Sequence, residues 1–184
     1  MASGSELLPQ VAKFVIPAVA VVAIVTDLVR GRIFNWLTLP TLLLGVVAAI
    51  YWGGWTAVGQ SALGIGLGLL LYGWMFWLGA MGGGDVKFLM ALGAWGGPRY
   101  VTEVAILAVL LGGAIGLVVM IFTGRIRGFS VRMYRFLLTL FIKDLVLEMP
   151  KVDRGFTMPF GVPIAIAAVW GLFAAPLKGW FLWN

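Results

Sequence analysis

Long apolar runs, separated by short glycine-rich or basic stretches, dominate the pattern of this chain. The runs cover about 14–29, 37–52, 57–78, 86–95, 101–122 and 158–181. Such runs predict membrane-spanning helices, because lipid offers backbone groups no hydrogen-bond partner outside a helix or a closed barrel. Barrel strands would alternate apolar and polar residues over short segments, and these runs do not. The pattern predicts an all-α, polytopic membrane protein with about six transmembrane helices.

The segments outside these runs are few. Residues 1–10 are polar and predict a flexible tail. The basic segment 124–157 carries apolar residues at helical spacing over 129–149, which is typical of an amphipathic helix on the membrane surface. No internal repeat stands out, so a transporter built from duplicated halves is disfavoured. We therefore expect one membrane-embedded domain over 1–184.

Composition agrees with a membrane protein. Hydrophobic residues make up 62% of the chain and charged residues 11%, whereas soluble domains carry about a quarter charged residues. The net charge of +6 does not indicate nucleic-acid binding, because basic residues in membrane proteins usually report topology. Loops 30–36, 79–87 and 124–157 hold ten of the 13 lysines and arginines. The positive-inside rule therefore places these loops in the cytoplasm and both termini outside it.

Cysteine and histidine are both absent. Their absence excludes disulfides, a thiol nucleophile, a Ser-His couple and the usual zinc sites. We therefore expect no metal or other cofactor. Any ionisable catalysis must use carboxylates, lysine, tyrosine, serine or threonine.

Two of the seven acidic residues stand out. Asp27 follows a long apolar run and lies one turn before the end of the first predicted helix. A carboxylate at that depth usually faces a polar interior and is functional, although pairing with Arg30 on the same helix face would also explain it. Asp85 follows three glycines and begins a helix, where an N-cap is the simpler explanation. Three glycines exceed the needs of a turn, however, and permit close backbone approach.

The predicted topology puts Asp27 and Asp85 on the same, cytoplasmic side. If the two carboxyls face each other they share one proton, and the pair can activate water against a peptide bond. Two other classes remain open at this point. The acids could form the relay of a proton-coupled transporter, or the chain could be a structural membrane component of a pilus assembly.

Three regions resemble the bacterial prepilin peptidases, which are aspartyl proteases with a GxGD signature. These are the glycine-rich stretch 79–87, the aspartate at 27 followed eight residues later by an asparagine, and the Met-Pro-Phe-Gly sequence 158–161. The resemblance implies Asp27 and Asp85 as the catalytic pair. It further implies these substrate-positioning or motif residues: Asn35, Gly82, Gly83, Gly84, Lys87, Pro159, Phe160 and Gly161.

The resemblance also implies an activity. Such enzymes lie in the bacterial inner membrane with the active site facing the cytoplasm. They remove the short basic leader of type IV prepilin-like precursors (Flp pilins and pseudopilins), typically after a glycine that precedes a hydrophobic helix. Bifunctional members carry an added cytoplasmic domain, often with paired Cys-x-x-Cys, and methylate the new N-terminus. This cysteine-free chain resembles the small, peptidase-only Flp or tight-adherence type.

Other GxGD proteases, of preflagellin-peptidase or presenilin-like type, are the nearest alternative. The presenilin-like type usually has tyrosine before its first aspartate, where this chain has Thr26. Lys87 is expected to anchor the membrane interface or to contact the substrate. Glycines 64, 66 and 68 predict a close helix contact. Five tryptophans near predicted span ends are expected to be interface anchors: Trp36, Trp52, Trp55, Trp95 and Trp180.

Overall fold

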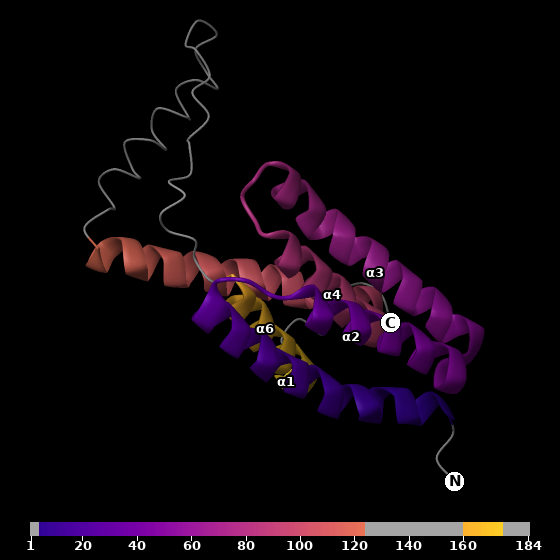
Figure 1. The fold of residues 1–184 in the computed structure, drawn as a ribbon. Helices are drawn as coiled ribbons and strands as arrows, with labels where there is room; N and C mark the ends of the chain where they lie inside the picture. Colours follow the sequence, from indigo (N-terminus) through magenta and orange to yellow (C-terminus); the bar gives the residue numbers. More distant parts are fainter. Residues whose placement is uncertain (1–3, 124–159, 175–184) are drawn as a thin grey trace, which may run out of the picture. The chain divides into compact units, whose positions relative to one another are not determined.

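The computed structural model describes residues 4–123 and 160–174, which form helices and short connections without a strand. The elements are α1 (Gly4–Arg30), α2 (Asn35–Ala48), the π-helical η1 (Ala49–Gly53), α3 (Gly54–Trp77), α4 (Gly83–Phe122) and α6 (Gly161–Ala174) (Figure 1). The all-α prediction is therefore confirmed for these residues. The first helix starts at Gly4, within the segment that was predicted to be a flexible tail.

Three described stretches are long and apolar enough to cross a membrane: Gln10–Arg30, Asn35–Trp77 and Gly83–Phe122. Two of them are broken by a glycine in the left-handed region, Gly54 with φ 65° and Gly97 with φ 76°, which disfavours other residues. Both breaks lie where the apolar pattern predicted span boundaries. Together with the shorter apolar helix Gly161–Phe173, the helical segments follow the predicted order, while six membrane crossings stay a prediction.

The chain forms two compact units. The first contains the described residues 4–111 and 160–174, and both candidate acids belong to it. Of the second unit, the structure describes residues 112–123, which continue α4. The predicted surface helix and basic segment 124–157, as well as Pro159 and Trp180, lie outside the described residues.

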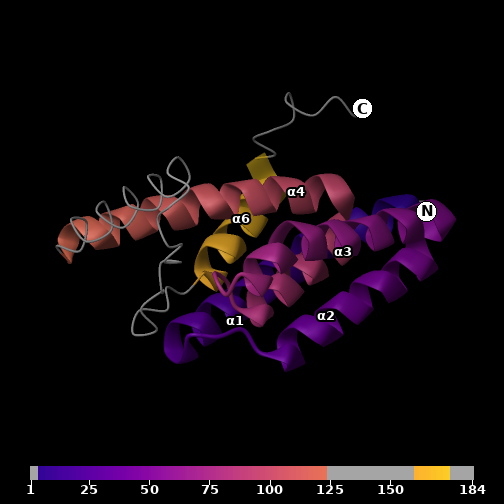
Figure 2. The same ribbon diagram turned by 90° about the horizontal axis from the view of Figure 1, so that it is seen from above.

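Within the first unit, α1 packs against α6 and α2, and α2 packs against α3. Figure 2 shows α6 between α1 and α4, and the Tyr100 hydroxyl of α4 donates a hydrogen bond to the Ala168 carbonyl of α6 (2.7 Å). The core between these helices is made of fully buried apolar side chains. Its largest members are Tyr72, Phe88, Ile16, Leu89, Leu92 and Ile164.

Glycines bring α3 and α4 into backbone contact. A Cβ atom added to Gly64 or Gly93 would overlap the carbonyl oxygen of the other, and one added to Gly68 would lie 3.0 Å from the Met90 Cα atom. The predicted close contact is thus confirmed for Gly64 and Gly68. It is wrong for Gly66, which is exposed and has nothing within 4 Å of its Cβ position.

Trp95 is buried, and its prediction as an interface anchor is wrong. Its indole N–H donates a hydrogen bond to the Thr41 carbonyl (2.8 Å). Gly45 makes room for the ring, because a Cβ there would lie 2.9 Å from Trp95 Cδ1. The side chain therefore joins α4 to α2. The other described members of the predicted set are exposed: Trp36, Trp52 and Trp55.

Candidate active site

Asp27 lies in the last turn of α1 with its side chain turned into the protein. The residue is only 3% exposed, and its Oδ2 atom accepts a hydrogen bond from the Val162 backbone N–H at the start of α6 (3.2 Å). A Cβ atom added to Gly161 would lie 2.7 Å from the same oxygen. The carboxylate therefore rests directly on the backbone of α6, where glycine leaves it space.

The pairing of Asp27 with Arg30 does not form in the described structure. The Arg30 guanidinium instead lies 5.3 Å from the centre of the Phe34 ring. The helix ends just beyond, where the Gly31 N–H donates to the Asp27 carbonyl oxygen (2.7 Å) and Gly31 takes φ 63°, as is common at helix C-termini. The side chain of Asp27 thus faces α6 rather than a neighbouring cation on its own helix.

Asp85 lies in the first turn of α4 rather than at its N-cap, so the simple capping explanation is wrong. Its backbone N–H donates to the Gly82 carbonyl (3.1 Å). Its Oδ2 atom lies over Gly82, where an added Cβ would approach it to 3.1 Å. A carboxylate in the first turn is favoured by the positive end of the helix dipole. Because residue 82 is a glycine, the Asp85 carboxylate can pack directly against the backbone at that position.

The two acids come from distant parts of the sequence and belong to the same compact unit. Asp85 is half-buried and Asp27 is buried. No hydrogen bond joins the two carboxyl groups in the part of the chain that the structure describes. Two carboxyls that face each other can act on one water molecule, one as proton acceptor and the other as proton donor.

Ile33, in the connection between α1 and α2, lies against Gly84, which precedes Asp85, and against Gly161, which contacts the Asp27 carboxylate. A Cβ on Gly84 would lie 2.6 Å from the Ile33 carbonyl oxygen, and one on Gly161 would lie 2.7 Å from Ile33 Cδ1. Ile33 is buried. The sequence analysis missed this residue. Its signal is an apolar side chain in the short loop that follows the basic end of the first helix.

Lys87 and Asn35 contact each other: the Lys87 ammonium donates to Asn35 Oδ1 (2.9 Å). The bond ties the first turns of α4 to the first residue of α2. The Lys87 side chain is therefore held against α2. Gly83, which lies between Gly82 and Gly84 in the sequence, faces the Phe76 ring; a Cβ added to it would lie 3.3 Å from that ring.

Phe160 packs edge-on against Tyr72, with 6.0 Å between the ring centres and an interplanar angle of 68°. Tyr72 is buried, and its hydroxyl donates to the Ala105 carbonyl (3.0 Å). Tyr72 was missed as well, although a lone phenol in an apolar, glycine-rich helix is the kind of residue that needs a specific partner.

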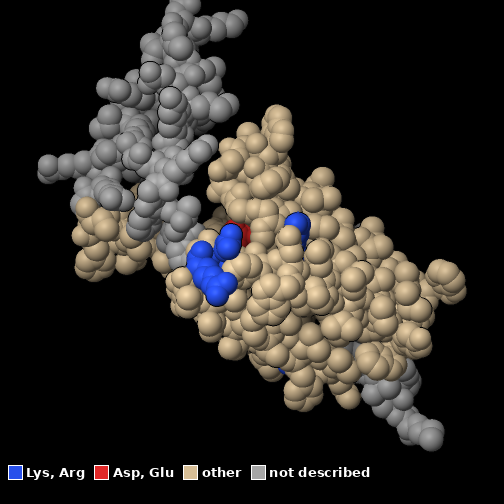
Figure 3. All heavy atoms as spheres, viewed as in Figure 1, with Lys and Arg blue, Asp and Glu red and all other residues tan. Residues whose placement is uncertain are grey.

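Basic groups surround this end of the first unit. The Arg32 guanidinium lies 4.8 Å from the centre of the Phe34 ring, which Arg30 also contacts. Figure 3 shows basic side chains gathered beside a small acidic patch, on a face that is otherwise largely uncharged. Within residues 4–123 and 160–174, no three His, Cys, Asp or Glu side chains gather into a group that could hold a metal.

Comparison with known proteins gives consistent matches. The model of the type IV leader peptidase family matches residues 14–117. Three relatives are named prepilin leader peptidase/N-methyltransferase. The one from Burkholderia pseudomallei strain K96243 is 33% identical over 99 residues, which cover 50% of this chain and 32% of that protein. Those from Pseudomonas putida and Pseudomonas aeruginosa are 30% and 33% identical over 146 residues, covering 73% of this chain and 41% of each relative.

The chain thus spans about a third to two fifths of the length of these relatives. No solved structure gives a significant match. The family model covers more than half of the chain and includes both Asp27 and Asp85. On this evidence the chain belongs to the type IV leader peptidase family.

Proposed function

We propose that this chain is an aspartic-type endopeptidase that removes the leader from type IV prepilin-like precursors, with Asp27 and Asp85 as its catalytic pair. The observation that carries the proposal is that Ile33 lies against both Gly84, next to Asp85, and Gly161. The Cβ position of Gly161 lies 2.7 Å from the Asp27 carboxylate, and the chain belongs to a family of leader peptidases. The transporter alternative would require acids along a path through the protein. Of the other described acids, Glu103 is ion-paired with Arg99 (3.5 Å).

The proposed chemistry uses one water molecule between the carboxyls. The ionised member takes a proton from water as its oxygen bonds to the scissile carbonyl carbon, while the protonated member donates to the carbonyl oxygen. Collapse of the tetrahedral intermediate breaks the C–N bond, and the proton held by the first acid passes to the leaving nitrogen. Because the pair titrates as a unit, neither acid receives a fixed role.

Gly82 supports access of an extended substrate. It is exposed, and the Cβ that it lacks would lie 3.1 Å from Asp85 Oδ2, so a peptide can approach the acid closely there. We propose cleavage after a glycine of the precursor, at the cytoplasmic face of the bacterial inner membrane. The basic residues Arg30, Arg32 and Lys87 support that orientation through the positive-inside rule.

We further propose that the chain is a peptidase of the Flp type without methyltransferase activity. The 184 residues contain no cysteine, and so none of the paired Cys-x-x-Cys motifs that the resemblance associates with bifunctional members. Mass spectrometry of the processed pilin tests this part: an unmodified N-terminus following a glycine is expected, and a methylated one would overturn it.

The catalytic pair is tested by co-expressing a prepilin with the wild type or with Asp27→Asn, Asp85→Asn or Asp144→Asn. Both dyad variants should abolish processing, while Asp144→Asn, a charge control from the basic segment, should process normally. Immunoblots establish that all four proteins reach the membrane equally. Full processing by either dyad variant would exclude the aspartyl mechanism and favour the transporter or the structural component.

Orientation has its own test, because the chain has no native cysteine. A single cysteine at Arg32 or at Lys13 can be labelled with a membrane-impermeant maleimide. In spheroplasts, Lys13→Cys should react at once and Arg32→Cys only after permeabilisation. The reverse order would place the candidate active site outside the cytoplasm.

A further inference from the structure

A hollow of about 480 Å³ lies at the other end of the first unit, away from the acids. Lys13 lines it, and the helix rise puts about 20 Å between Lys13 and Asp27 along α1. Gly53 and Gly97 also line it, so it opens where the chain breaks before α3 and within α4. Its walls come from α1, η1, α3, α4 and α6. The hollow is therefore separate from the candidate active site.

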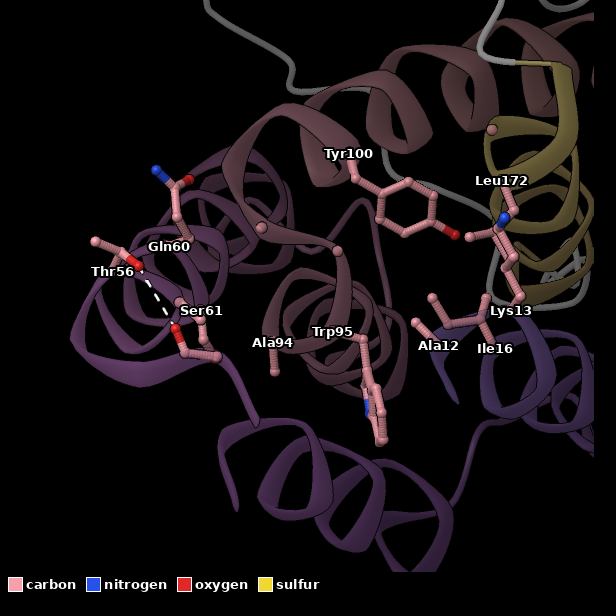
Figure 4. Close-up of a pocket in the computed structure, with 15 residues that line it drawn as sticks. Ala12, Lys13, Ile16, Thr56, Gln60, Ser61, Ala94, Trp95, Tyr100 and Leu172 are labelled. Atoms are coloured by element: carbon pink, nitrogen blue, oxygen red, sulfur yellow. Dashed lines mark hydrogen bonds between the residues drawn. The ribbon is translucent and has the colours of Figure 1, made fainter. Parts of the chain in front are cut away.

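Polar groups face one another across this hollow (Figure 4). Lys13 lies on one side next to Leu172, and Thr56, Gln60 and Ser61 lie on the opposite side. Lys13 has no hydrogen bond or ion pair in the part of the chain that the structure describes. Ser61 is 3% exposed, and its hydroxyl likewise has no hydrogen-bond partner there. A buried hydroxyl without a partner is unfavourable, so a polar ligand here would stabilise the site.

The aromatic groups of the hollow supply apolar walls. The Trp95 indole N–H and the Tyr100 hydroxyl already donate to backbone carbonyls, at 2.8 Å and 2.7 Å. No acidic residue lines the hollow among the described residues. Glu103, one turn beyond Tyr100, is paired with Arg99. A ligand that fits must therefore be anionic on the Lys13 side, hydroxyl-bearing on the Gln60 side, and apolar beside the rings.

We propose that this hollow binds the head group of an anionic membrane phospholipid, with Lys13 at the phosphate and Gln60 and Ser61 at hydroxyls of the head-group alcohol. Lys13 belongs to a stretch apolar enough to cross a membrane, close to its end, where lipid phosphates are at hand. A lipid also fills the apolar walls with its glycerol and first acyl carbons. A soluble phosphate would leave those walls against water.

The test is native mass spectrometry of the full chain in detergent, titrated with phosphatidylglycerol, phosphatidylcholine or diacylglycerol. Phosphatidylglycerol should bind most tightly. Lys13→Gln should weaken it about fivefold, since one basic group near a lipid surface is worth about 1 kcal/mol. Gln60→Leu should weaken it about twofold to threefold through a lost hydrogen bond. Both side chains are exposed, so both variants should fold.

Arg99→Gln is the matched control, because it removes a charge from the same break in α4 and Arg99 is not one of the residues that line the hollow. Its lipid affinity should equal that of the wild type, as should that of Asp27→Asn, which separates this site from the proposed catalysis. The proposal is overturned if Lys13→Gln binds like the wild type, or if diacylglycerol or phosphatidylcholine binds as well as phosphatidylglycerol. Displacement of the lipid by equimolar glycerol phosphate would overturn the lipid assignment.

Discussion

Glycines at helix ends and glycines in helix middles make different contacts in this protein. Gly84 and Gly161, near the starts of α4 and α6, lie against the Ile33 carbonyl oxygen and the Asp27 carboxylate. Gly64 and Gly93, in the middle of packed helices, lie against each other's backbone. The first pair shapes the surroundings of the acids, and the second sets the spacing of α3 and α4. Substitutions in the two pairs should therefore separate activity from stability.

Among the glycine substitutions, the largest effect on activity is expected from Gly161→Ala. Its Cβ would lie 2.7 Å from both Asp27 Oδ2 and Ile33 Cδ1, so the carboxylate must move and its bond to Val162 N–H must lengthen. A displacement of about 1 Å at a catalytic group lowers the rate by about 100-fold. Time courses of prepilin processing at equal membrane abundance measure this loss.

Gly83→Ala is the matched control for that variant. Its Cβ would meet only the Phe76 ring, at 3.3 Å, and Phe76 is 54% exposed and free to shift. Processing should stay near the wild-type rate. Equal processing rates for Gly161→Ala and Gly83→Ala would contradict the prediction, because only Gly161 lies against the Asp27 carboxylate.

The next effect is one of stability. Gly64→Ala places a methyl group on the Gly93 carbonyl, and overpacking of this kind costs about 1–3 kcal/mol. The purified variant should melt at a lower temperature and yield less monodisperse protein, while processing per folded molecule stays unchanged. Gly66→Ala, on the exposed side of the same helix, should show no loss. A stable Gly64→Ala protein with reduced activity would break the distinction between the two pairs.

Much of this arrangement could be predicted from sequence because its signals are local. The helix order and the glycine breaks follow from the apolar pattern. Asp27 is a candidate because it follows a long apolar run, and Asp85 because it follows three glycines. The sequence also contains enough information to predict which glycines of α3 face α4, although the sequence analysis did not use it. Gly64 and Gly68 are four residues apart and share a helix face, whereas Gly66 lies two residues from each and faces away.

The rest depends on partners distant in sequence. Trp95 resembles an interface anchor until Gly45 of another helix makes room for it. Ile33 gains its position only through contacts with Gly84 and Gly161, and Tyr72 only through Phe160 and Ala105. No pattern within a single helix contains this information.

A smaller loss is expected from Ile33→Ala, which removes the side chain packed against Gly161. The start of α6 and the Asp27 carboxylate should become less well positioned, and processing should slow by about tenfold, less than for Gly161→Ala. A positioning role predicts a lower kcat with little change in KM, and partial rescue by Ile33→Val. Leu28→Ala, which trims an exposed neighbour of Asp27, should have no effect. A rise in KM alone would assign Ile33 to substrate binding instead.

The smallest effect concerns the bond between Lys87 and Asn35, which joins α4 to α2 at 2.9 Å. Because this pair is exposed, its loss should cost about 0.5–1 kcal/mol, or a twofold to fivefold slower processing. A double-mutant cycle with Lys87→Met and Asn35→Ala decides what the lysine does. If Lys87 acts only by holding Asn35, the double variant should be no slower than either single one. Additive losses would mean that Lys87 also contacts the substrate, and the basic groups around the acids would then belong to the substrate-binding surface.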